Sequence, residues 1–147
     1  MKVNISFLPD QQIGFVNHSI LALQGNIELN EIDDNELEEL LVLEVIEYLP
    51  RNLFENVMKH WVSKLAHKGR FTFDFVDIYT VSRLFFLQLI SINDYNILTH
   101  GQANRGWDNK QVNLTTPQVC QAMENLGLKV ISKKIDGVKA TIVAERP

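Results

Sequence analysis

The amino-acid sequence predicts a single α/β domain over residues 1–147, with a mostly parallel sheet that closes in an antiparallel hairpin. Three observations predict it. Strand-like and helix-like stretches alternate along the chain, which is typical of layered α/β folds. The last two strand-like stretches flank Asp136-Gly137, a strong signal for a tight hairpin turn. The length also fits one domain with one core.

Seven stretches have the composition of strands. Residues 2–8 alternate apolar with polar side chains, which is the two-residue period of a half-buried strand. Residues 40–46 are leucine and β-branched residues apart from Glu44, which is typical of a strand in a buried sheet. We expect one sheet in which only the last strand runs antiparallel to the main group. The expected strands are 2–8, 15–20, 27–30, 40–46, 71–76, 128–134 and 138–145.

Three stretches have the apolar period of a helix. Residues 50–65 carry an unbroken apolar stripe that contains Trp61, which we expect in the core rather than in a functional site. Residues 78–90 carry a second stripe. A third helix is expected to begin at Thr116, where a proline follows, and to stop at Gly127.

Two further stretches give weaker signals. The two acids and the asparagine at 33–35 offer helix caps, so a short helical turn is expected over 36–39. Residues 91–114 are polar and have no clear period. We therefore expect them to be irregular, and we expect residues 93–113 to be the most mobile part of the domain and to cover the crevice at the strand ends.

Composition and charge exclude several classes of function. The chain is 46% hydrophobic and 22% charged, which is ordinary for a globular domain, and no apolar run is long enough to span a membrane. Cys120 is the single cysteine, so an internal disulfide is excluded and a reducing, cytoplasmic compartment is expected. Ten acids and no Lys or Arg lie between residues 3 and 50, so nucleic acid binding is not expected through this half.

Four segments carry recognisable patterns in a fixed order. They are 3–20 (VNISFLPDQQIGFVNHSI), 43–50 (LEVIEYLP), 61–78 (WVSKLAHKGRFTFDFVDI) and 114–134 (LTTPQVCQAMENLGLKVISKK). Together they resemble the class I S-adenosylmethionine-dependent methyltransferases. The corresponding family patterns are LNLGCGxxxxxGWINVDI, VLEHLP, RVLKPGGRLVIxxPDI and FTxxxLxxLLxxAGFxxV. The resemblance implies a three-layer, Rossmann-like sheet of seven strands, with methyl transfer in the crevice at the carboxyl ends of the strands.

The resemblance also implies where the cofactor would bind. The positions are Ser6, Phe7, Leu8, Asn17, His18 and Glu44. The family has a glycine-rich turn at the first three, which lets the cofactor approach the backbone, whereas Phe7 and Leu8 add bulk there. The family has an acid for the ribose hydroxyls at the next two, and neither Asn17 nor His18 is an anion. The sequence therefore predicts a degenerate site that binds S-adenosylmethionine weakly or not at all.

The connection between the first two strands leaves two alternatives. Six residues separate Leu8 from Phe15, fewer than the dozen that a parallel crossover usually needs. Either a stretched loop replaces the family's first helix, or the two strands pair as a hairpin. The collinear segment GFVNHSI favours the loop.

Several polar residues are candidates for contact with a substrate or partner. His100, Arg105 and Trp107 lie in the irregular segment, together with Lys110. Glu47 and Glu44 lie near the end of the fourth expected strand, where α/β sheets place ligands, but solvated carboxylates are the simpler interpretation.

Other chemistry-bearing residues have a simpler structural interpretation. Asp77 is expected to cap the following helix, and Cys120 to be a packed thiol. His60 and His67 are expected on a helix surface, and no pair of histidines has the spacing of a metal site.

Two functions from different classes remain open, and the resemblance favours the first. The first is a small methyltransferase-like enzyme, in which catalysis would rest on proximity and orientation. The second is a methyltransferase-fold protein that has lost its cofactor site and acts as a non-catalytic binding or partner subunit. Its partner would be a small molecule or a protein, with no metal and no membrane involved.

Overall fold

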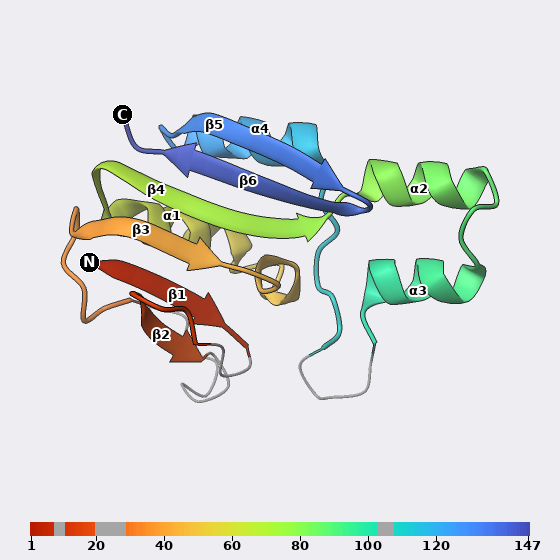
Figure 1. Ribbon diagram of the computed structural model, residues 1–147, viewed down its shortest axis with the longest axis horizontal. Helices are drawn as coiled ribbons and strands as arrows, with labels where there is room; N and C mark the ends of the chain where they lie inside the picture. Colours follow the sequence, from red (N-terminus) through yellow and green to blue (C-terminus); the bar gives the residue numbers. More distant parts are fainter. Residues whose placement is uncertain (8–10, 20–28, 103–107) are drawn as a thin grey trace.

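The six strands of the computed structural model form one sheet in the order β2-β1-β3-β4-β6-β5 (Figure 1). The structure describes residues 1–7, 11–19, 29–102 and 108–147. The strands are β1 (Lys2–Ser6), β2 (Val16–Ser19), β3 (Leu37–Val42), β4 (Leu65–Val76), β5 (Lys129–Asp136) and β6 (Lys139–Glu145). The helices are η1 (Ile46–Tyr48, a 3₁₀ turn), α1 (Phe54–Lys64), α2 (Ile78–Phe86), α3 (Ile92–His100) and α4 (Thr116–Asn125).

Strand directions confirm the expected α/β class. β1 pairs in parallel with β2 and with β3, and β3 pairs in parallel with β4. β6 runs antiparallel to both β4 and β5, so β6 alone opposes the other strands. The hairpin of β5 and β6 turns at Gly137, whose φ of 62° is the left-handed conformation that tight two-residue hairpin turns require.

The parallel pairing of β1 with β2 decides between the two alternatives for their connection. The strands are in register from Val3 opposite Val16 to Ser6 opposite Ser19. In the described part of the connection, residues 7 and 11–15, the backbone forms turns and bends rather than a helix. A short loop therefore makes the crossover, as the collinear segment indicated.

The core lies between the sheet and the helices α1 and α4, which are both behind the sheet in Figure 1. Trp61 of α1 is fully buried and meets the ring of Phe71 edge-on, with centroids 6.1 Å apart, which confirms its expected place in the core. Phe73 and Phe75 continue this aromatic row along β4. Among the described residues, no helix lies in front of the sheet. Helices α2 and α3 lie beyond the carboxyl ends of the parallel strands.

Several expected element boundaries are wrong, and the strand expected over 40–46 ends at Val42. Residues 36–39 do not form a helical turn, because Leu37 begins β3 and is fully buried between its neighbouring strands. The first long helix ends at Lys64, so His67 lies in β4 and not on a helix. Residues 67–69 form an irregularity in β4, where a Cβ on Gly69 would stand 2.5 Å from the carbonyl oxygen of Leu37.

Two other stretches also differ from expectation. Residues 91–114 are not irregular throughout, because α3 occupies 92–100 and begins with a capping box between Ser91 and Asp94. Of the expected strand 27–30, residues 27–28 lie outside the described residues, and Leu29 and Asn30 are not in a strand.

Candidate functional site at the carboxyl ends of the strands

The carboxyl ends of β1, β3 and β4 lie at one edge of the sheet, where parallel α/β folds place their ligands. The residues that follow these strands carry the chemistry of this edge. Phe7 follows β1, Glu44 follows β3, and Asp77 follows β4. Leu8, which was also expected at the cofactor turn, lies outside the described residues.

An aromatic pair occupies the corner between β1 and η1. The Phe7 ring packs against the core and meets the ring of Tyr48 edge-on, with centroids 5.5 Å apart. Burial raises the pKa of the Tyr48 phenol, and the nearby Glu47 carboxylate adds to this, so Tyr48 stays neutral at ordinary pH. The position at which a glycine turn would admit a cofactor therefore holds a packed side chain.

The side-chain amide of Asn17 holds the crossover between β1 and β2. Its Oδ1 accepts hydrogen bonds from Asn4 Nδ2 at 3.0 Å and from the backbone N–H of Gln12 at 2.9 Å. Its Nδ2 donates to the carbonyl oxygens of Phe15 at 3.0 Å and Gln12 at 3.3 Å. An aspartate could accept the first two bonds, but it has no N–H to donate the other two. Asn17 thus has a structural task at the position where the family has its ribose-binding acid.

Ser6 and His18 lie on neighbouring strands beside this network. Ser6 is buried at the end of β1, opposite Ser19, whose Oγ donates to the carbonyl oxygen of Phe7 at 2.8 Å. His18 is half-buried and lies opposite Ile5. The structure therefore brings Ser6, Phe7, Asn17 and His18 together at one end of β1 and β2.

Glu44 faces solvent. Its φ of 58° is left-handed, and its backbone N–H donates to the Asp74 carboxylate at 2.7 Å. Its own carboxylate, 73% exposed, pairs with Lys139 Nζ at 2.8 Å. Burial raises the pKa of Asp74, although the hydrogen bond from Glu44 and the charge of Lys139 oppose this rise. Glu44 thus joins β3, β4 and β6 at the strand-end edge, as a solvated carboxylate.

Glu47 and Lys110 form a buried ion pair that the sequence did not predict. Lys110 Nζ lies 2.8 Å from Glu47 Oε2, and both side chains are 6% exposed. The same ammonium group donates to the carbonyl oxygen of Leu98 at 2.7 Å. Burial raises the pKa of Glu47, and the Lys110 charge offsets part of this rise. The pair fixes the segment after α3 against η1, so Lys110 is not available to a ligand.

The Asp77 carboxylate caps α2, as expected, and also bonds the first residue of α4. It accepts from the backbone N–H of Thr80 at 3.0 Å and from that of Thr116 at 2.8 Å. Burial alone would raise the pKa of Asp77, but these bonds and those from the two threonine hydroxyls outweigh it and hold the pKa below its ordinary value. An acid that is held ionised by four donors is a structural anchor rather than a base.

The remaining candidates are dispersed. His100 is exposed at the end of α3, while Arg105 and Trp107 lie outside the described residues. His60 is half-buried in α1 and accepts from the backbone N–H of Leu29 at 3.0 Å through Nε2. Cys120 is partly buried and packs against the core, as expected of a structural thiol.

Two findings concern other classes of site. Within the residues that the structure describes, no three His, Cys, Asp or Glu side chains gather as a metal site would require. In the same part of the chain, no helix combines the length and the apolar character needed to cross a membrane.

Comparison with known proteins defines the fold. No family model matches the sequence, and no curated protein matches it. Solved structures do match. A possible exported protein from Bordetella parapertussis has a TM-score of 0.60 and 14% identity over 90% of this chain. A possible histamine N-methyltransferase from Thermotoga maritima, described as S-adenosylmethionine-dependent, has a TM-score of 0.55 and 12% identity over 90% of this chain.

A third similar structure is a putative methyltransferase from Haloferax volcanii in complex with the Trm112 methyltransferase activator, with a TM-score of 0.58 and 11% identity over 94% of this chain. The chain therefore has the class I methyltransferase fold. It spans 52% of the length of the Bordetella protein and 64% of each of the other two.

Proposed function

We propose that this chain is a methyltransferase-fold protein with a degenerate cofactor site, which acts as a non-catalytic binding or partner subunit. The observation that carries the proposal is the contact between Phe7 and Tyr48. It fills the corner at the end of β1 where close approach to the backbone would be needed. We further propose that the chain forms a single domain and that the protein is located in the cytoplasm.

The engaged amide of Asn17 supports the same proposal. Hydrogen bonds from ribose hydroxyls to a charged acceptor contribute about 1.5–3 kcal/mol, and a neutral amide that is already bonded on both sides cannot replace them. The bulk of Phe7 and the missing anion at Asn17 would both weaken the binding of S-adenosylmethionine. Their effects on its affinity therefore combine.

A protein partner is favoured by one of the structural neighbours. The Haloferax volcanii methyltransferase was solved as a complex with an activator protein, so this fold accommodates a second polypeptide. We propose that this chain likewise binds a protein partner.

Calorimetric titration with S-adenosylmethionine and S-adenosylhomocysteine tests the proposal. We expect no saturable binding of either up to about 1 mM. The matched variant Phe7→Gly removes the ring while keeping the strand, and circular dichroism checks that both proteins are folded. A micromolar or tighter dissociation constant for the wild type would overturn the proposal.

One observation favours a second function, an active methyltransferase with a shifted cofactor. Glu47 and Asp74 are buried carboxylates with raised pKa values near the strand ends, and such groups are candidates for acid–base work. Micromolar binding of S-adenosylhomocysteine in the same titration would favour this second function.

A further inference from the structure

Helices α2 and α3 form a hairpin that projects beyond the carboxyl ends of the strands (Figure 1). The two helices pack on each other through the rings of Phe85 and Tyr95, whose centroids lie 4.7 Å apart. Gln88, with a φ of 59°, lies in the connection, and the Ser91–Asp94 capping box begins α3. The hairpin is thus a well-formed unit with defined ends.

The end of this hairpin exposes an unusual amount of apolar surface. Phe86 is 84% exposed, Leu89 67% and Ile92 59%. With Phe85 and Leu87 they make the hairpin patch. Large side chains at these exposures present roughly 600 Å², at the upper end of the largest patch on a typical monomer, ~300–600 Å². This area approaches the ~800 Å² that each partner contributes to a standard protein interface.

The helical hairpin itself carries almost no charge. Between residues 78 and 100, Arg83 and Asp94 are the only Lys, Arg, Asp or Glu residues, and they have opposite signs. Like charges across an interface oppose association, and here a second copy of the same surface meets little such repulsion. A membrane-binding surface would be rich in Lys or Arg, and this segment has one arginine.

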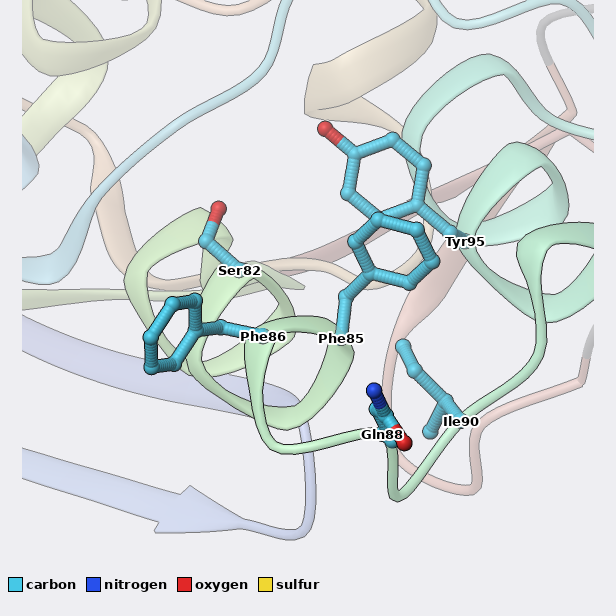
Figure 2. Close-up of a pocket in the computed structure, with 6 residues that line it drawn as sticks. All are labelled: Ser82, Phe85, Phe86, Gln88, Ile90 and Tyr95. Carbon is cyan, nitrogen blue, oxygen red and sulfur yellow. The ribbon is translucent and has the colours of Figure 1, made fainter.

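A hollow lies beside the exposed ring of Phe86. Figure 2 shows it between α2, the connection and α3, and its volume is about 440 Å³. Its lining is Ser82, Phe85, Phe86, Gln88, Ile90 and Tyr95. One surface therefore carries both a protruding aromatic ring and an adjacent space that is wide enough for such a ring.

We propose that the hairpin patch binds a second copy of this chain, in a two-fold symmetric dimer. A two-fold contact is self-complementary, so a projection and a hollow on the same surface satisfy each other twice. Each Phe86 enters the hollow of the other copy, and the contact buries the hairpin patches of both copies. Phe86 is the central side chain of this contact.

Sedimentation equilibrium between about 1 and 200 µM tests the proposal, because weak dimers dissociate across this range. We expect a dimer for the wild type. The variants Phe86→Glu and Leu89→Glu should weaken the dimer about 30-fold or more, as loss of a central interface residue does. The matched control is Ile135→Glu on β5, where an isoleucine is 50% exposed but lies outside the hairpin patch.

Three outcomes would overturn the proposal. They are a wild type that stays monomeric at the highest concentration, a dimer that survives both hairpin substitutions, and a dimer that Ile135→Glu disrupts equally. Because the substituted side chains are exposed, the variants are expected to fold, and thermal unfolding checks this. Amide exchange gives a second measurement: exchange in residues 85–92 should slow as concentration rises, and concentration-independent exchange would contradict dimerisation there.

Discussion

Asp77 and Thr116 are joined by two hydrogen bonds, from the threonine backbone N–H at 2.8 Å and its hydroxyl at 3.0 Å to the same carboxylate oxygen. The other oxygen of Asp77 serves Thr80 in α2 in the same way. One side chain therefore joins the beginnings of two helices that are far apart in sequence.

Replacement of Asp77 by alanine should lower the free energy of unfolding by roughly 2–4 kcal/mol, because two helix ends lose their acceptor. Urea unfolding at pH 7 measures the loss. Thr80→Ala is the matched control and should lose less, since one hydroxyl alone is removed. Equal losses for Asp77→Ala and Thr80→Ala would contradict the dual role.

The depressed pKa of Asp77 also predicts a pH dependence. A carboxyl group whose pKa is lower in the folded state contributes stability above its unfolded pKa, about 3.9, and loses it as pH falls through the folded value. Subtracting the unfolding free energies of wild type and Asp77→Asn from pH 7 to pH 2 isolates this contribution. The difference should shrink below about pH 4. A difference that is constant with pH would show that Asp77 is not the titrating group.

The buried pair of Glu47 and Lys110 should be sensitive to loss of one partner. Lys110→Met leaves the Glu47 carboxylate buried and unpaired, so we expect a loss of about 3–5 kcal/mol in unfolding free energy. With the cation gone, the pKa of Glu47 should rise further, and the deficit should shrink as pH is lowered and the carboxyl group takes up a proton. Chemical unfolding at several pH values measures both effects.

The matched control for this pair is Lys59→Met, which breaks the exposed ion pair with Glu55. That change should alter stability by less than about 0.5 kcal/mol. If Lys110→Met is equally mild, the buried pair does not hold the segment after α3 in the way described.

Trp61→Ala should lower the unfolding free energy by roughly 3–5 kcal/mol, because it opens a cavity beneath β4. Tyr79, whose side chain is exposed, provides the control, and Tyr79→Ala should have little effect. Thermal unfolding distinguishes them. A Trp61→Ala protein of near wild-type stability would contradict the placement of this ring in the core.

Asn17→Asp tests whether the amide is structural. The substitution restores the type of residue that the family has, but it removes the donors to Phe15 and Gln12. We expect a loss of about 1–3 kcal/mol, the penalty for leaving such acceptors unpaired, without gain of cofactor binding. Asn96→Asp on the exposed surface of α3 is the control. A stable Asn17→Asp protein that binds S-adenosylmethionine would show that the missing carboxylate alone prevents binding in the wild type.

The sequence predicted those parts of the fold that local patterns determine. The alternation over residues 2–8 and the turn at Gly137 depend on neighbouring residues, and the structure confirms both β1 and the hairpin. The start of β3 was missed because the caps at 33–35 are local, while pairing with β1 and β4 decides the outcome. Helix α3 was missed because it has no apolar stripe, although Ser91 and Asp94 were a usable signal.

The candidate site was less predictable because its contacts are distant in sequence. Glu47 and Lys110 are 63 residues apart, and no local pattern links them. Phe7 and Asn17 were singled out from the sequence as departures from the family's residues. Their partners, Tyr48 and Asn4, follow only from the way η1 and β1 pack.

The position of β6 has a consequence for how the chain folds. Its residues lie between β4 and β5, so Arg70 of β4 is opposite Glu145, 75 residues later in the chain. Until the last strand arrives, β4 has an open edge and β5 cannot join the other strands. Such non-local pairing slows folding, since a long loop must close before the contacts form. Formation of the complete sheet must therefore await β6, and until then the edge of β4 is open to pairing with other chains.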